Sequence, residues 1–163
     1  QGFWLDLDWG NYPYVTSSTT LPYAACSLGF PPQKIRKIYG AAKIYDTRSG
    51  TDPDFPETLL EDYELAKVAQ EGSEYGVTTG RKRKCNWLNL DLLIKAINVS
   101  GTTHVVISKI DVLQKLKYFR LFYKQRSFSF FSDEEMFNFI NKQIIDNCEL
   151  VKDIVFSSSP HSF

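Results

Sequence analysis

The chain has 163 residues, of which 43% are hydrophobic and 23% are charged, and its 19 basic and 19 acidic residues give a formal net charge of zero. This length suits one domain with a substantial buried core, and the composition excludes a disordered chain. Zero net charge excludes a general attraction to nucleic acid or to an anionic membrane, and no apolar run approaches the roughly 20 residues of a membrane-spanning helix. We therefore expect no nucleic-acid partner and no membrane partner.

The N-terminal stretch begins at Gln1 without a methionine, and residues Phe3–Asp8 alternate apolar and acidic side chains as a β-strand does. Domains more often begin with a loose polar tail, so we expect sequence upstream of Gln1 to be missing here. A polar loop at Thr16–Thr20 follows, and its hydroxyls suit a phosphate or a sugar. Pro31 and Pro32 predict a short helix that ends at Gly40.

The middle and the end of the chain alternate between predicted strands and helices. We predict strands at Ala42–Tyr45, His104–Ser108 and Val151–Phe156, and helices at Glu57–Val68, at Leu88–Ile97 and from a capping box at Ser132–Glu135. Such alternation favours an α/β fold with a mostly parallel sheet flanked by helices, in one domain over residues 1–163.

The cysteines and histidines offer no metal site or disulfide framework. Cys26, Cys85 and Cys148 are scattered and form no CxxC pair, and the histidines are His104 and His161. A zinc site would need these residues at a spacing that the sequence lacks. We expect reduced thiols and assign no metal ligand.

Lys109 and Asp111 come directly after the apolar strand His104–Ser108. In open α/β sheets the ligand crevice lies at the carboxyl ends of the strands. A carboxylate there can accept the ring N–H and the amino group of guanine, while the lysine stem lies along the base. Taken alone, the motif favours the alternative, a solvated Lys–Asp pair after a core strand.

A glycine-bracketed basic loop spans Gly76–Lys84. Two threonines followed by arginines can hold a small dicarboxylate or a phosphate, because arginine offers a planar fork of donors. The alternatives are a solvated basic turn and a nuclear-localisation or heparin-like patch. Neither alternative accounts for the Thr78-Thr79-Gly80 prefix.

Taken together, these motifs resemble the C-terminal part of adenylosuccinate synthetases, of the eukaryotic type or of a compact viral type. The resemblance lies in Gln1-Gly2 with Leu5–Asp8 and Gly10–Ser18, in Gly29–Gln33 with Tyr45–Arg48, in Gly76–Arg83 with Trp87-Leu88, and in Lys109–Leu113. These stretches occur in the order of the family across the first two-thirds of the chain. The resemblance implies a fold related to the P-loop NTPases, here incomplete.

The family joins L-aspartate to C6 of IMP with GTP and Mg²⁺, first phosphorylating O6 and then displacing that phosphate with the aspartate amine. It is a ligase of purine biosynthesis, and its members are typically cytoplasmic homodimers. The resemblance implies IMP binding by Gln1 and Thr16, aspartate binding by Thr78, Thr79 and Arg81, and GTP binding by Arg83, Lys109, Asp111, Ser157, Ser158 and Ser159.

The catalytic groups of the family belong to its N-terminal part. The phosphate-binding loop with its magnesium and general-base Asp, and the general-acid His, match no residue of this sequence. We therefore assign no catalytic residue, and we expect the chain alone to lack ligase activity. Two alternatives stay open: a viral relative that makes 2-aminoadenylosuccinate from dGMP, and a non-catalytic nucleotide-binding module.

Overall fold

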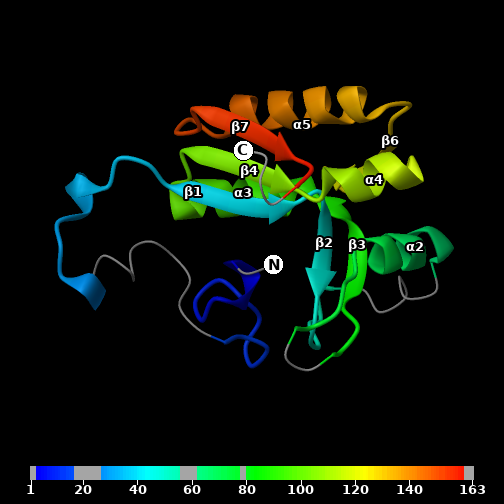
Figure 1. Cartoon of the computed structure of the whole chain (residues 1–163). Coiled ribbons are helices and arrows are strands. Elements are labelled where there is room, and N and C mark those ends of the chain that lie inside the picture. The colour runs from blue at the N-terminus through cyan, green and yellow to red at the C-terminus, as the bar shows by residue number, and fades with distance from the viewer. Residues whose placement is uncertain (1–2, 17–26, 56–61, 78–79, 160–163) are drawn as a thin grey trace.

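Two β-sheets organise the chain in the computed structural model, which describes residues 3–16, 27–55, 62–77 and 80–159 (Figure 1). The described helices are the 3-10 helices η1 (Phe3–Leu5) and η2 (Pro32–Lys34) and the α-helices α2 (Tyr63–Glu71), α3 (Leu90–Ser100), α4 (Ile110–Leu116) and α5 (Asp133–Asn147). Among the described residues no helix has the length and apolar content needed to cross a membrane.

The first sheet is parallel throughout, with strand order β1-β4-β7. Its strands are β1 (Tyr39–Lys43), β4 (His104–Ser108) and β7 (Asp153–Ser157). Ser108 pairs with Lys43 on one side and with Ser157 on the other. The carboxyl ends of all three strands therefore lie in one row, where an open α/β sheet places its ligand.

The second sheet is mixed and has the order β2-β3-β5-β6. Its strands are β2 (Tyr45–Arg48), β3 (Lys84–Asn89), β5 (Arg120–Tyr123) and β6 (Arg126–Ser129). Strands β3 and β5 are parallel, and the outer pairings are antiparallel. The chain passes from the first sheet to the second at Ile44, which is fully buried and donates its N–H to the Ser108 carbonyl at 2.9 Å.

One hydrophobic core joins both sheets to the helices, and the fully buried residues Ile44, Leu88, Ile107, Leu121 and Ile140 belong to it. Helix α5 lies along β7 (Figure 1), where the Phe137 ring stacks on the Phe156 ring with 4.3 Å between centroids. Helix α3 runs beside α5, since the Asn98 amide donates to the Asn147 carbonyl at 3.0 Å.

The α/β prediction is confirmed, although the mixed second sheet was not foreseen. The strand His104–Ser108 has its predicted bounds, and the last strand begins two residues later than predicted. The Ser132 cap is also confirmed, because the Ser132 hydroxyl accepts the Glu135 N–H at 3.2 Å. The Glu135 carboxylate reaches back one residue further than in the usual capping box and accepts the Phe131 N–H at 2.9 Å.

The predicted strand Phe3–Asp8 is wrong, because this stretch forms η1 and the turn that follows it. Its backbone groups pair locally: Asp6 N–H donates to the Phe3 carbonyl at 3.1 Å, and Gly10 N–H donates to the Asp6 carbonyl at 2.8 Å. The fully buried Asp6 also accepts the Asp8 N–H on its carboxylate at 2.9 Å. Local hydrogen bonds of this kind compete directly with strand pairing.

Other predicted bounds need correction. The helix from Pro31 ends as η2 at Lys34, because Ile35 is extended and Tyr39 pairs with His104 in the parallel sheet. The single strand Ala42–Tyr45 is instead two strands that meet at Ile44, and the helix placed at Leu88–Ile97 begins only at Leu90. The predicted helix Glu57–Val68 is described only in part, and α2 extends to Glu71.

Candidate functional site

The row of strand ends brings together the residues predicted to bind guanine. Lys109 directly follows β4, and Asp111 lies exposed in the first turn of α4. Ser157 ends the neighbouring strand β7 and pairs with Ser108. The parallel register therefore places these two stretches, which are about fifty residues apart in sequence, at one edge of the sheet.

Lys109 has an unusual backbone conformation at this edge. Its φ of 65° and ψ of 25° put it in the left-handed region, at the N-cap of α4. Residues other than glycine pay roughly 1–2 kcal/mol there, and such strain clusters at functional sites. The Lys109 ammonium donates to the Gly72 carbonyl at 3.0 Å. The lysine is thus held against the end of α2.

Ser157, Ser158 and Ser159 differ in exposure. Ser157 is only 3% exposed and donates its hydroxyl to the Ser159 carbonyl at 2.7 Å, whereas Ser158 and Ser159 are exposed. The Ser157 hydroxyl therefore shapes the turn after β7, and the exposed serines beyond it border the row of strand ends.

Backbone hydrogen bonds close the basic loop at its base. Gly76 N–H donates to the Arg81 carbonyl, and Gly80 N–H donates to the Gly76 carbonyl, each at 2.8 Å. Tyr75 and Lys82 form an antiparallel bridge, and Gly80 has a φ of 63° that glycine tolerates well. Arg81 is exposed on this loop, while Thr78 and Thr79 lie outside the described residues.

A buried carboxylate, Glu74, anchors the loop to both sheets. Glu74 is 1% exposed and accepts hydrogen bonds from Lys43 Nζ at 2.7 Å, from Tyr45 Oη at 2.8 Å and from Arg83 Nη1 at 3.0 Å. Burial alone would raise the pKa of Glu74, but these hydrogen bonds outweigh burial and lower the pKa. The carboxylate is therefore charged at neutral pH.

Tyr45 completes this buried cluster. Burial, and to a lesser extent the hydrogen bond to Glu74, raises the pKa of Tyr45 above its usual range. The phenol therefore stays protonated and donates a hydrogen bond to Glu74. A Cβ added at Gly72 would collide with the Tyr45 hydroxyl. Glycine at that position therefore lets Tyr45 reach Glu74.

The segment Gly72–Glu74 connects the two predicted ligand-binding motifs. Its Gly72 carbonyl receives Lys109, and its Glu74 carboxylate receives Arg83. Glu74 also binds Lys43, the last residue of β1, which pairs with Ser108. The basic loop and the Lys109 motif are thus held at the same end of the parallel sheet.

The loop at residues 10–16 lies near the start of β3. Arg48, which is 4% exposed, donates from Nη2 to the Tyr14 carbonyl at 2.6 Å. Arg48 pairs with Lys84, the residue after Arg83, in the β2–β3 ladder. Thr16 is exposed and donates its N–H to the Leu5 carbonyl at 2.9 Å, and Gln1 lies outside the described residues.

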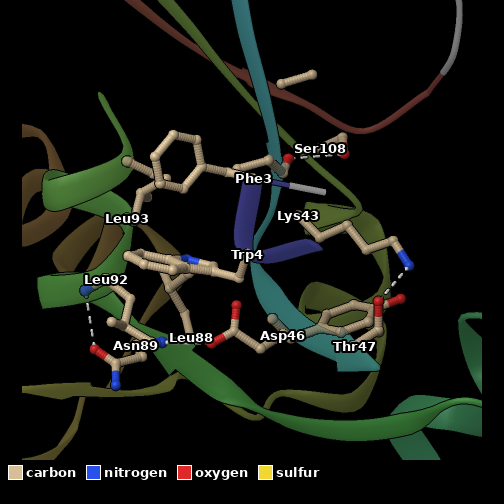
Figure 2. A pocket seen from close by; sticks show the side chains of 14 residues that line it. Phe3, Trp4, Lys43, Asp46, Thr47, Leu88, Asn89, Leu92, Leu93 and Ser108 are labelled. Atoms are coloured by element: carbon tan, nitrogen blue, oxygen red, sulfur yellow. Dashed lines mark hydrogen bonds between the residues drawn. The ribbon is translucent and has the colours of Figure 1, made fainter. Parts of the chain in front are cut away.

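A cavity of about 400 Å³ opens beside the ends of β1 and β4. Figure 2 shows the Trp4 ring beside Leu92, with Asp46 below it and the Lys43 side chain directed toward Thr47. The other residues that line the cavity are Phe3, Ala41, Ala42, Tyr45, Leu88, Asn89, Leu93, Ala96 and Ser108. Burial raises the pKa of Asp46 to about 6, although the hydrogen bond from Asn89 N–H at 2.9 Å opposes this shift. Mostly apolar walls with a few polar groups are typical of small-molecule sites.

Neither Glu74 nor Lys43 was predicted from the sequence, because Lys43 is 31 residues away from Glu74 and a glutamate in a turn-rich segment is expected to be solvated. One signal was present: Glu74 lies seven residues before the run of four basic residues, Arg81–Lys84, in a glycine-rich segment. Among the described residues no group of three or more Asp, Glu, His or Cys side chains could hold a metal ion. These residues therefore do not by themselves fit a magnesium site.

Comparison with known proteins gives a consistent result. A family model described as adenylosuccinate synthetase matches residues 1–151. The adenylosuccinate synthetase of Candida dubliniensis is 48% identical over 115 residues, which cover 69% of this chain and 26% of that protein. The Candida glabrata protein of the same name is 50% identical over 110 residues, which cover 67% of this chain and 25% of that protein. The chain thus spans about a quarter of the length of the curated relatives it matches.

Solved structures agree with this result. The fully ligated adenylosuccinate synthetase of Plasmodium falciparum superposes with a TM-score of 0.72 at 27% identity, covering 96% of this chain and 46% of that one. The succinoaminodeoxyadenylate synthetase of cyanophage S-2L shares the fold, with a TM-score of 0.63 at 19% identity over 98% of this chain and 42% of that one. Because the family model matches most of the sequence, the chain belongs to the adenylosuccinate synthetase family.

Proposed function

We propose that the chain forms the C-terminal part of a single adenylosuccinate synthetase domain. The enzyme is a ligase of purine biosynthesis that joins L-aspartate to IMP and converts GTP to GDP and phosphate. The observation that carries this proposal is the shared anchor Gly72–Glu74, which holds Lys109 and Arg83 at one end of the parallel sheet. A nucleotide and a small anion bound there would lie next to each other, as a joint reaction requires.

In this proposal Lys109 and Asp111 bind the guanine of GTP. The exposed Asp111 carboxylate accepts the ring N–H and the amino group, and the Lys109 stem lies along the base. Ser157, Ser158 and Ser159 border the base from the adjacent strand end. Adenine presents the opposite donor pattern and is rejected.

The basic loop binds the remaining substrates. Thr78, Thr79 and Arg81 hold the aspartate, Arg83 contacts the GTP phosphates, and Gln1 and Thr16 hold IMP. Arginines placed this way stabilise the charge that develops when O6 is phosphorylated and when the aspartate amine displaces the phosphate. Magnesium, when bound, neutralises charge on the transferring phosphoryl group. We expect it to be held mainly by residues outside this chain, and we expect a cytoplasmic homodimer.

The proposal is tested by base choice in the full-length protein carrying Asp111→Asn. An amide can donate to the carbonyl that xanthine has in place of the guanine amine, so use of GTP should fall and use of xanthosine triphosphate should rise. Unpaired polar groups cost about 1–3 kcal/mol each, so each change should be roughly tenfold to a hundredfold. Affinities for aspartate and IMP should change far less.

The matched control is Asp153→Asn, the same substitution in an exposed residue at the other end of the same sheet. An unchanged preference for GTP in Asp111→Asn would refute the guanine assignment. Use of ATP and dGMP instead would favour the viral type of enzyme. The cyanophage S-2L protein, which was solved bound to dGMP and to dATP as an energy donor, is an example of that type.

A further inference from the structure

Arg83 is fixed on one side and open on the other. Its Nη1 donates to the buried Glu74 carboxylate at 3.0 Å, while 30% of its side chain is exposed. Within the described part of the chain, Arg83 makes no other side-chain hydrogen bond. A guanidinium carries five N–H donors in a rigid plane, so the outer donors of Arg83 can receive an anion in a fixed orientation.

A second cation binds the same carboxylate. Lys43 Nζ contacts both Glu74 oxygens at 2.7 Å and the Thr47 hydroxyl at 3.2 Å. These contacts commit the ammonium group to Glu74 and Thr47. Its charge nevertheless counts, because Glu74 and Arg83 alone would form a neutral pair, whereas Lys43, Glu74 and Arg83 together carry a charge of about +1.

We propose that Glu74 and Lys43 are positioning residues for Arg83: Glu74 fixes the guanidinium, and Lys43 cancels the Glu74 charge so that Arg83 presents a full positive charge to a carboxylate or phosphate. This inference rests on the proposed function only in taking Arg83 as a residue that binds an anionic ligand. It adds a role for Glu74 and Lys43 that does not require either residue to touch the ligand.

A purely structural role makes a different prediction. Removing one partner of a buried ion pair destabilises a protein, because the other charge is left uncompensated. If Lys43 served stability alone, its loss would lower the unfolding temperature, but folded molecules would bind anions as before. Anion affinity of the folded chain, measured well below the unfolding temperature, therefore separates the two roles.

The experiment titrates the purified chain with inorganic tripolyphosphate by calorimetry. Lys43→Gln removes the charge and keeps a donor for Glu74, and Lys43→Met is a second neutral replacement should the first fail to fold. Either should weaken binding roughly tenfold at low salt, and the loss should shrink as salt screens the charge. Lys43→Arg should restore affinity to within about threefold, since it keeps the charge.

Two further variants decide the outcome. Lys115→Met removes a lysine from an exposed pair with Glu71 and should leave affinity unchanged. Arg83→Met should lose most of the binding. If Arg83→Met binds weakly but the neutral Lys43 variants bind like the unaltered chain, the positioning role is overturned and the ligand role of Arg83 stands. If Arg83→Met binds as tightly as the unaltered chain, or if that chain does not bind, the role of Arg83 in the proposed function fails as well.

Discussion

Replacing Lys109 by glycine and by alanine should separate its backbone role from its ligand role. Both substitutions remove the hydrogen bond to the Gly72 carbonyl, which for a half-exposed charged donor is worth about 1 kcal/mol. Alanine keeps the left-handed strain at a φ of 65°. Glycine relieves roughly 1–2 kcal/mol of that strain, but it lowers the stability by up to about 1 kcal/mol because it gives the unfolded chain more conformational freedom. We expect Lys109→Ala to be about 1 kcal/mol less stable than the unaltered chain, with Lys109→Gly closer to it.

Urea unfolding measures the stability difference, and calorimetric titration with GDP measures the ligand role. Both variants should bind GDP about tenfold more weakly, because neither has the stem that lies along the base. A glycine variant less stable than the alanine variant would refute the backbone argument. Unchanged GDP affinity in both would instead show that Lys109 only supports the fold.

Four shorter predictions concern stability, each measured by denaturant unfolding. Burial raises the pKa of Asp46 to about 6 in the folded chain, so folding favours the protonated carboxyl group. The resulting stabilisation of the folded chain is complete below the ordinary aspartate pKa and is lost as pH rises through 6. Asp46→Asn should therefore stabilise the chain by roughly 1–3 kcal/mol at about pH 8 and little at about pH 4; equal effects at both would contradict the shift. Gln125→Gly should stabilise by about 0.5–1 kcal/mol, because Gln125 has a φ of 60° in a two-residue turn; destabilisation would argue against that turn. Ser132→Ala should cost about 1 kcal/mol through the lost helix cap, with Ser132→Thr close to neutral as its control. Ile140→Ala should cost about 2–5 kcal/mol, because Ile140 is fully buried, and a cost below 1 kcal/mol would exclude it from the core.

The elements found from the sequence are those whose signal is local. Strand β4 is a short β-branched apolar run, and its buried position in the middle of a parallel sheet is what such a run favours. The Ser132 cap and the acidic residues of the first turn predict helix α5 from the sequence. In both cases the propensity of the residues agrees with the tertiary structure.

The β5–β6 hairpin was missed because its turn uses unusual residues. Tyr123 pairs with Arg126, so Lys124 and Gln125 form a two-residue loop in which both have positive φ values, 49° and 60°. Turns of this type are usually recognised by Asn-Gly or Asp-Gly, and Lys-Gln gives no such signal. Its support is tertiary, since the Lys124 N–H donates to the Asp91 carboxylate at 2.6 Å from α3.

The candidate site likewise has a part that the sequence predicts and a part that it does not. That Lys109 and Asp111 lie at a strand end follows from the sequence, because a strand that ends in polar residues places them at the ligand edge of a parallel sheet. The Glu74 cluster does not, since Lys43 and Tyr45 are 31 and 29 residues away from the carboxylate they bind. A glutamate within a turn-rich segment is expected to be solvated. Only the folded chain shows it buried, and a buried carboxylate needs charged partners. Arg83, predicted as a ligand residue alone, is therefore also part of what keeps Glu74 buried and the two sheets joined.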